Sequence, residues 1–197
     1  MNNAVLILGA GLRLAVTIAR SLHRQNIPVI VAPMTSAEPA IQSRAIQRHV
    51  LLPDSRANPK EFISELSDLI RAENIDMVIP TGDGAMAAVA QHYEVLSRTV
   101  HVGAPHPIIM ERVLNKTLTL AAAQRCKIPV PISRIVEDPS DIDKVVQGLQ
   151  FPLIAKPAVR KGINNYKIKY FVDPESLRTN VLESRDMWRG ALVQEYI

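Results

Sequence analysis

Two lysines occupy positions where the surrounding sequence would aim an ammonium group at an anion. Lys156 ends the apolar run 153–155 and precedes Pro157. A lysine at the end of a buried strand is costly unless it meets an anionic partner, and the following proline favours an extended conformation that fixes its direction. Lys116 follows Asn115 at the expected start of a helix, where an ammonium can neutralise a phosphate oxygen. Taken alone, each lysine is more often a solvated side chain.

A third candidate lies in the last six residues, which read Leu192-Val193-Gln194-Glu195-Tyr196-Ile197. An apolar strand that leads into a carboxylate can offer backbone groups to the edge of an adenine and an acceptor to its amino group. The same pattern also fits an ordinary strand that ends in surface residues. Because natural termini more often trail into polar residues, the sequence favours a longer protein in which further chain follows.

Glycines follow two of the apolar runs. Gly9-Ala10-Gly11 comes after residues 4–8, but a dinucleotide-binding fingerprint would need a third glycine where Leu14 stands. It would also need an acidic residue near Ala32, at the end of the next apolar run. The motif therefore favours a structural turn over an NAD or FAD site. Residues 81–84, Thr-Gly-Asp-Gly, present Asp83 either to a ligand or, as we favour, as a helix N-cap.

The first half of the chain alternates short apolar runs with amphipathic segments. The runs predict buried strands at residues 4–8, 28–32, 49–52, 76–80 and 100–102. The segments between them predict helices at residues 12–25, 59–70 and 85–96. In the first helix the apolar face is expected to be Leu14, Ile18 and Leu22, and Asn58 is expected to cap the second. Strands that alternate with helices predict an α/β domain, residues 1–106, with a parallel, doubly wound sheet.

The pattern changes after Pro105 and Pro107, which predict a linker. Helices are expected at residues 108–114, 116–126, 140–149 and 174–187, with Asn115 and Ser140 as caps of the second and third. Strands are expected at residues 132–136, 153–156, 166–172 and 191–193. The alternation of apolar and polar residues at 166–172 is typical of a half-exposed antiparallel strand. Residues 107–197 are therefore expected to form a second, α+β unit.

Composition limits the class of protein. The net charge is +4, but the basic residues form no long run, so no nucleic-acid partner is expected. No apolar run reaches the roughly 18 residues that a membrane span requires, so no membrane partner is expected either. The single cysteine, Cys126, excludes an intrachain disulfide and agrees with a reducing compartment, which predicts a cytoplasmic protein. The sequence leaves open whether the protein is a homo-oligomer.

The order and spacing of these motifs resemble the ATP-grasp superfamily of ligases. In that family a helix opens with a lysine, a strand ends in Lys-Pro, and a later strand leads into a glutamate hinge. Here these features stand at residues 115–131, 152–157 and 192–197. Residues 4–102 are similar to the Rossmann-like pre-ATP-grasp domain of carbamoyl-phosphate synthase and biotin carboxylase relatives, and the whole looks most like a carboxylate–amine ligase. The resemblance implies a pre-ATP-grasp domain followed by the first lobe of the ATP-grasp domain, truncated at the adenine hinge.

The resemblance also assigns roles to the candidate residues. It implies that Lys116 and Lys156 contact ATP phosphates, that Glu195 binds the adenine amino group, and that Tyr196 and Ile197 supply backbone contacts at the hinge. It implies a flap over the phosphates at residues 158–165, although only one glycine is present there. Magnesium ligands are implied in a second lobe after residue 197. No residue of this chain is assigned a catalytic role, and the chain alone is expected to be inactive.

The resemblance implies an enzyme that uses ATP and magnesium to phosphorylate a small carboxylate and passes the acyl group to an amine or another nucleophile. Two alternatives from other classes remain open at this point. One is a non-catalytic module that binds a nucleotide or small molecule, and the other is an NAD-type Rossmann domain. The broken glycine motif at residues 9–11 speaks against the second alternative.

Overall fold

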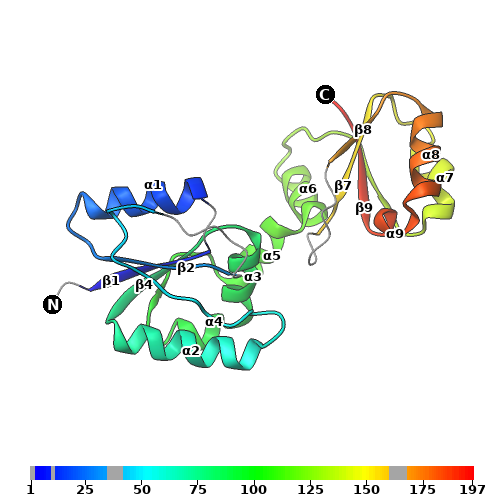
Figure 1. The fold of residues 1–197 in the computed structure, drawn as a ribbon. Coiled ribbons are helices and arrows are strands. Elements are labelled where there is room, and N and C mark those ends of the chain that lie inside the picture. Colours follow the sequence, from blue (N-terminus) through cyan, green and yellow to red (C-terminus); the bar gives the residue numbers. More distant parts are fainter. Residues whose placement is uncertain (1–2, 10–11, 35–41, 160–167) are drawn as a thin grey trace. The chain divides into compact units, whose positions relative to one another are not determined.

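The computed structural model describes residues 3–9, 12–34, 42–159 and 168–197. The chain divides into two compact units, Met1–Met110 and Glu111–Ile197. Figure 1 shows both units as ribbons, with the first in blue to green and the second in green to red. In the described part of the chain, every helix is too short or too polar to span a bilayer.

The first unit is built on a five-stranded sheet whose pairings are all parallel. Its strands, in the order β3-β2-β1-β4-β5, are β3 (Arg48–His49), β2 (Val29–Ala32), β1 (Ala4–Leu8), β4 (Ile75–Pro80) and β5 (His101–Val102). Strands β1 and β2 are buried along their whole length, as their uninterrupted apolar runs predict. The predicted parallel sheet is confirmed.

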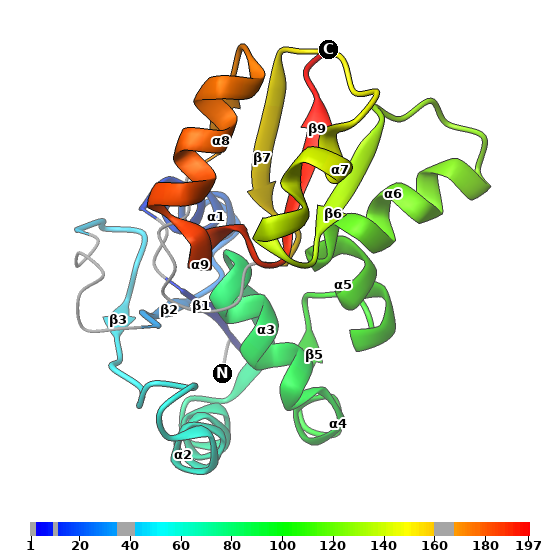
Figure 2. The ribbon, with the colours of Figure 1, turned by 90° about the vertical axis from the view of Figure 1, so that its right-hand side faces the viewer.

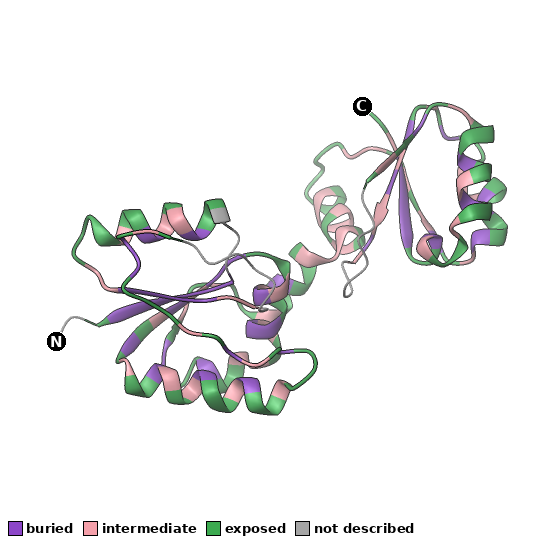
Figure 3. Cartoon of the chain, in the orientation of Figure 1, coloured by how far each residue is buried: buried purple, intermediate pink, exposed green. Residues whose placement is uncertain are grey.

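Helices cover both faces of this sheet. Helix α1 (Leu12–His23) lies on one face, and α2 (Pro59–Ala72), α3 (Asp83–Gln91) and α4 (Tyr93–Leu96) lie on the other (Figure 1). Successive side chains of β1 point to opposite faces of the sheet. Leu6 and Leu8 therefore pack in the core under α2 and α3, whereas Ile7 packs in the core under α1. Figure 3 shows the buried positions concentrated on the strands and on the sides of α1 and α2 that face this sheet. The fold is therefore doubly wound.

Three local predictions for these helices are wrong in whole or in part. The N-cap of α3 is Gly82 and not Asp83, which is the first residue of that helix. In α1, Ile18 and Leu22 pack against the core as predicted, but Leu14 is exposed. The fully buried positions are Ala15 and Ala19, because two alanines let the helix backbone approach the sheet closely. Asn58 precedes α2 but makes no capping hydrogen bond through its side chain. Asp54 accepts backbone hydrogen bonds from the turn before α2, and these bonds lower the pKa of its carboxyl group.

The end of β1 requires a glycine. Gly9 has φ +92°, and a Cβ at this position would lie 2.5 Å from the carbonyl oxygen of Thr81. The Thr81 hydroxyl donates to the carbonyl oxygen of Gly9 at 2.8 Å, which ties the end of β1 to the end of β4. Gly9 therefore has a structural reason to be glycine, as expected, and the rest of that motif, residues 10 and 11, lies outside the described residues.

The second unit is built on a four-stranded sheet whose pairings are all antiparallel. In the order β6-β9-β7-β8 its strands are β6 (Ser133–Val136), β9 (Ala191–Glu195), β7 (Leu153–Pro157) and β8 (Lys169–Phe171). The helical elements are α5 (Pro107–Leu114), which crosses the boundary between the units, α6 (Lys116–Arg125), η1 (Pro139–Asp141), α7 (Ile142–Val146), α8 (Pro174–Glu183) and α9 (Arg185–Trp188). The predicted α+β character of this unit is confirmed.

Helices α7, α8 and α9 cover one face of this antiparallel sheet, and α6 lies on the other side (Figures 1 and 2). The core under the three helices includes Leu153 and Ala155 from β7, Val193 from β9, and Leu177 and Trp188 from the helices. Helix α6 has no buried residue among those described. The second face of the sheet is thus covered less completely than the first.

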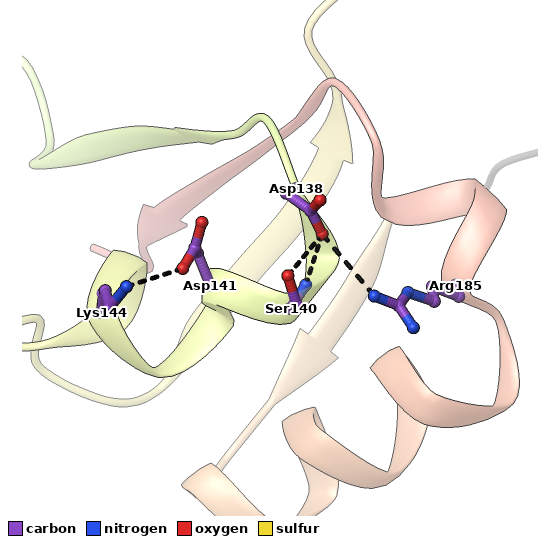
Figure 4. Close-up of polar contacts among 5 residues, drawn as sticks. All are labelled: Asp138, Ser140, Asp141, Lys144 and Arg185. Carbon is purple, nitrogen blue, oxygen red and sulfur yellow. Dashed lines mark hydrogen bonds and ion pairs between the residues drawn. The ribbon is translucent and has the colours of Figure 1, made fainter.

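Polar contacts hold the covering helices together at the end of β6 (Figure 4). Asp138 accepts from the backbone amide and the hydroxyl of Ser140 at 2.8 and 2.7 Å and lies 3.7 Å from Arg185. These hydrogen bonds lower the pKa of Asp138, and the charge of Arg185 adds to the effect. Asp138 therefore caps the first turn, and the prediction that Ser140 does so is wrong, because a carboxylate two residues earlier accepts both donors.

Candidate functional site

Strand alternation places Lys156 on the face of the second sheet that α7, α8 and α9 do not cover. In β7, Leu153 and Ala155 point into the core under these helices. Ile154 and Lys156 alternate with them and therefore point to the opposite face. Lys156 is only partly buried. The lysine that ends this apolar strand is thus held at the edge of the core, as the sequence predicts.

A neutral side chain holds the Lys156 ammonium. Its Nζ donates to Oε1 of Gln194 at 2.7 Å. Nε2 of Gln194 donates to the Ser133 hydroxyl at 2.8 Å, and that hydroxyl donates to the carbonyl oxygen of Pro131 at 2.8 Å. Among the described residues the partner of Lys156 is therefore an amide and not a carboxylate.

The start of α6 brings Lys116 to the same place. Asn115 caps α6, since its side chain accepts from the backbone amide of Thr117 at 3.0 Å, as predicted. The backbone amide of Lys116 donates to the carbonyl oxygen of Ala158 at 2.9 Å, and a β-bridge joins Asn115 to Val159. The helix start is therefore hydrogen-bonded to the chain just after β7. The two lysines, which are far apart in the sequence, lie close together.

The electrostatics of this pair favour an anion. Burial lowers the pKa of Lys156, and the positive charge of Lys116 lowers it further. Both effects oppose the charged form of Lys156, and the amide oxygen that holds its ammonium carries no net charge. An anion placed between the two ammonium groups would offset both effects. A phosphate chain, which carries several negative oxygens, fits this arrangement.

The structure places the Glu195 side chain away from the two lysines. Glu195 pairs with Leu153, so alternation directs it to the face that carries α7. Its Oε1 accepts from the backbone amide of Gln150 at 2.8 Å. The carboxylate thus already holds the loop before β7, and its expected contact with an adenine amino group stays a prediction.

Tyr196 and Ile197 follow β9. The backbone amide of Tyr196 donates to the carbonyl oxygen of Pro152 at 3.0 Å, which leaves its carbonyl oxygen as the group that could meet a base. The Tyr196 ring packs edge-on against Tyr170 with centroids 5.5 Å apart. Tyr170 pairs with Ile154, so this aromatic pair borders the face that carries Lys156. Ile197 is 91% exposed.

Comparison with known proteins identifies the fold. No protein-family model matches the sequence. The formate-dependent phosphoribosylglycinamide formyltransferase of Sulfurisphaera tokodaii is 19% identical over 170 residues, which span 80% of this chain and 41% of that protein. Among solved structures, the L-amino acid ligase of Bacillus licheniformis matches 100% of this chain and 45% of its own, with a TM-score of 0.72 and 17% identity. The chain has the fold of about half the length of ATP-grasp ligases.

Two further ATP-grasp structures contain nucleotide. The N5-carboxyaminoimidazole synthetase of Staphylococcus aureus, complexed with ADP, matches 100% of this chain and 48% of its own, with a TM-score of 0.71 and 15% identity. The biotin carboxylase domain of the 2-oxoglutarate carboxylase of Hydrogenobacter thermophilus, complexed with MgADP, ADP and bicarbonate, matches 100% and 45%, with a TM-score of 0.70 and 15% identity. The chain thus spans less than half the length of these proteins.

Three residues of the ATP-grasp fold described here were given no role from the sequence. The antiparallel register of the four strands places Gln194, Ser133 and Tyr170 in one row across the sheet. The sequence alone does not show this register. One signal was available for Gln194, because a glutamine inside an apolar strand must find hydrogen-bond partners when it is buried. The proposed flap residues Arg160, Lys161 and Gly162 lie outside the described residues.

The described residues do not supply a magnesium site to this ATP-grasp fold. Among them, no three His, Cys, Asp or Glu side chains come together as metal ligands would. The side chain that holds the Lys156 ammonium is the neutral amide of Gln194, and the charge that acts on it is the cation of Lys116. The expectation that metal ligands follow residue 197 stays a prediction.

Proposed function

We propose that residues 1–197 bind the ATP of an ATP-dependent carboxylate–amine ligase. One observation carries the proposal: the start of α6 at Lys116 is hydrogen-bonded to the chain just after Lys156, whose ammonium is held by a neutral amide, in a fold that nucleotide-binding ligases share. Two neighbouring lysines, of which Lys156 is held by an amide and not by a carboxylate, favour the binding of a polyanion over that of a neutral ligand. The fold alone would not favour this function, since one fold serves many.

Each candidate residue has its own role in binding ATP. Lys116 and Lys156 offset the negative charge of the phosphates. Glu195 and Ile197 hold the adenine at the hinge, together with the carbonyl oxygen of Tyr196, whose amide is already bonded to Pro152. This role requires the Glu195 carboxylate to exchange the Gln150 amide for the adenine amino group. The first unit, as a pre-ATP-grasp domain, contributes to the site of the acceptor carboxylate.

The reaction of the whole enzyme transfers the γ-phosphoryl group of ATP to a small carboxylate. This first step forms the acyl phosphate and ADP. An amine then attacks the acyl carbon, loses a proton and displaces inorganic phosphate, which forms the amide. Magnesium, when bound, neutralises the charge that develops on the phosphoryl group. Since its ligands are expected outside this chain, we propose that residues 1–197 bind ATP without turning it over. The single exposed Cys126 supports a cytoplasmic setting.

Calorimetric titration with ATP and with NAD tests this proposal. We expect the wild-type chain to bind ATP and not NAD. The Lys156→Ala variant should lose affinity for ATP by about tenfold or more, since a hydrogen bond to a charged group contributes about 1.5–3 kcal/mol. The Lys144→Ala variant is the matched control, because Lys144 lies in the same unit and pairs with Asp141. Equal ATP affinities for wild type and Lys156→Ala would remove Lys156 from the site.

A further inference from the structure

Gln194 is a buried polar residue near the end of a strand that begins with three apolar residues. It is 5% exposed and lies between Val193 and Glu195 in β9. It pairs directly with Ser133 of β6 and with Ile154 of β7, so its side chain shares one face of the sheet with both. Lys156 lies on the same face, diagonally across from Gln194, within reach of its long side chain.

The hydrogen bonds of Gln194 fix which end of its amide faces the lysine. Nε2 donates to the Ser133 hydroxyl, whose own proton is directed to the carbonyl oxygen of Pro131. Ser133 is therefore an acceptor for Gln194, which requires the NH₂ end of the amide on that side. The reversed amide would point NH₂ at an ammonium group, which donates but cannot accept. The three residues thus form a directed chain from the Pro131 carbonyl to Lys156.

A neutral acceptor at this position differs from a carboxylate in one respect. A carboxylate at hydrogen-bond distance would form an ion pair with Lys156 and compete with any bound anion. The amide oxygen holds the ammonium at 2.7 Å and leaves its charge uncompensated. The neighbouring carboxylate of Glu195 is kept out of reach, because alternation directs it to the opposite face, where it accepts from Gln150.

We propose that Gln194, oriented by Ser133, is a positioning residue that holds Lys156 toward the nucleotide phosphates without neutralising its charge. The inference rests on the proposed function, since it assumes that Lys156 meets a polyphosphate. It adds a residue pair that sets how strongly the site attracts this ligand. The lowered pKa of Lys156 is consistent with such an arrangement.

The test replaces the neutral acceptor with a charged one in the full chain. Gln194→Glu places a carboxylate beside Lys156, so the pKa of Lys156 should rise and ATP affinity should fall about tenfold or more. The ammonium pKa is read from the ¹³Cε resonance of Lys156 without ligand, and the affinity is read by calorimetric titration with ATP. Gln147→Glu is the charge-matched control, because Gln147 is exposed and follows α7 on the covered face. It should change neither quantity.

Ser133 variants test the orientation and do not depend on Gln194→Glu folding. Ser133→Ala should weaken ATP binding several-fold, and Ser133→Thr, which keeps the hydroxyl, should restore it. A wild-type chain that binds ATP, together with a Gln194→Glu variant that binds it equally well, would overturn this inference alone. A Ser133→Ala variant with unchanged affinity would also count against it. A wild-type chain that binds no ATP would overturn the proposed function itself.

Discussion

The backbone amide of Lys116 donates to the carbonyl oxygen of Ala158, 2.9 Å away, two residues after Lys156. This bond fixes the first residue of α6 against the chain that leaves β7. It brings the backbones of the two lysines together although they lie on separate elements, while Gln194 holds the ammonium of Lys156. The meeting of these two residues is what the proposed nucleotide site depends on.

A double-mutant cycle on Lys116 and Lys156 should show coupling in ATP binding. If both ammonium groups contact one phosphate chain, each single alanine variant should lose about tenfold or more in affinity. The double variant should then lose a different amount from the sum of the two free-energy changes. Calorimetric titration at two salt concentrations provides the measurement, since contacts between charges weaken with salt. Additive losses at both salt concentrations would indicate two independent effects.

Asn115→Ala should weaken both α6 and the site. The Asn115 side chain caps the helix that begins at Lys116, and loss of such a cap reduces stability by about 0.5–2 kcal/mol. Because the cap also fixes the start of α6, affinity for ATP should fall with it. The measurements are urea unfolding and ATP titration. Asn115→Asp is the control, since aspartate caps equally well, and it should keep most of the stability.

Gly9→Ala should destabilise the first unit by about 2 kcal/mol or more. The added Cβ would need a positive φ and would lie 2.5 Å from the Thr81 carbonyl oxygen. The matched control is Gly84→Ala in α3, where the nearest atom to an added Cβ is an Arg56 nitrogen at 3.9 Å. Alanine is favoured over glycine inside a helix, so this control should be neutral or stabilising. Scanning calorimetry compares the two variants, and an equal effect of both would contradict the prediction.

The sequence was sufficient where the information is local. Strand β1 was predicted from an apolar run that stops at Gly9, and the start of α6 was predicted from Asn115, whose side chain bonds to residues only two and three positions away. These features depend on neighbours in the chain. The same holds for Lys156, because the proline that follows it restricts its backbone to an extended conformation.

The sequence was insufficient where residues far apart in the chain determine the packing of a side chain or its hydrogen-bond partner. Leu14 fits the apolar rhythm of α1 but is exposed, because Ala15 and Ala19 provide the closer packing against the sheet. The partner of Gln194 depends on how β6, β7 and β9 pair, and the sequence does not state this register. The bond from Gln150 to Glu195 has the same origin.

Acid should weaken the first unit through His92. This residue lies between α3 and α4 beside Phe62, with ring centroids 6.1 Å apart, and its Nε2 is buried without a hydrogen-bond partner among the described residues. Burial lowers the pKa of His92 below its ordinary value of 6.5. The unfolded chain therefore takes up a proton before the folded chain does, so the free energy of unfolding falls as the pH drops below about 6.5.

Urea unfolding followed by circular dichroism between pH 7.5 and 5 measures this effect. The His92→Gln variant should lose part of the pH dependence that the wild-type chain shows, because glutamine does not titrate in this range. His101→Gln is the control, since His101 is exposed at the edge strand β5 and should leave the wild-type pH dependence in place. If wild type and His92→Gln lose stability in parallel as the pH falls, then the acid sensitivity resides in other groups and the partly buried ring of His92 makes no measurable contribution.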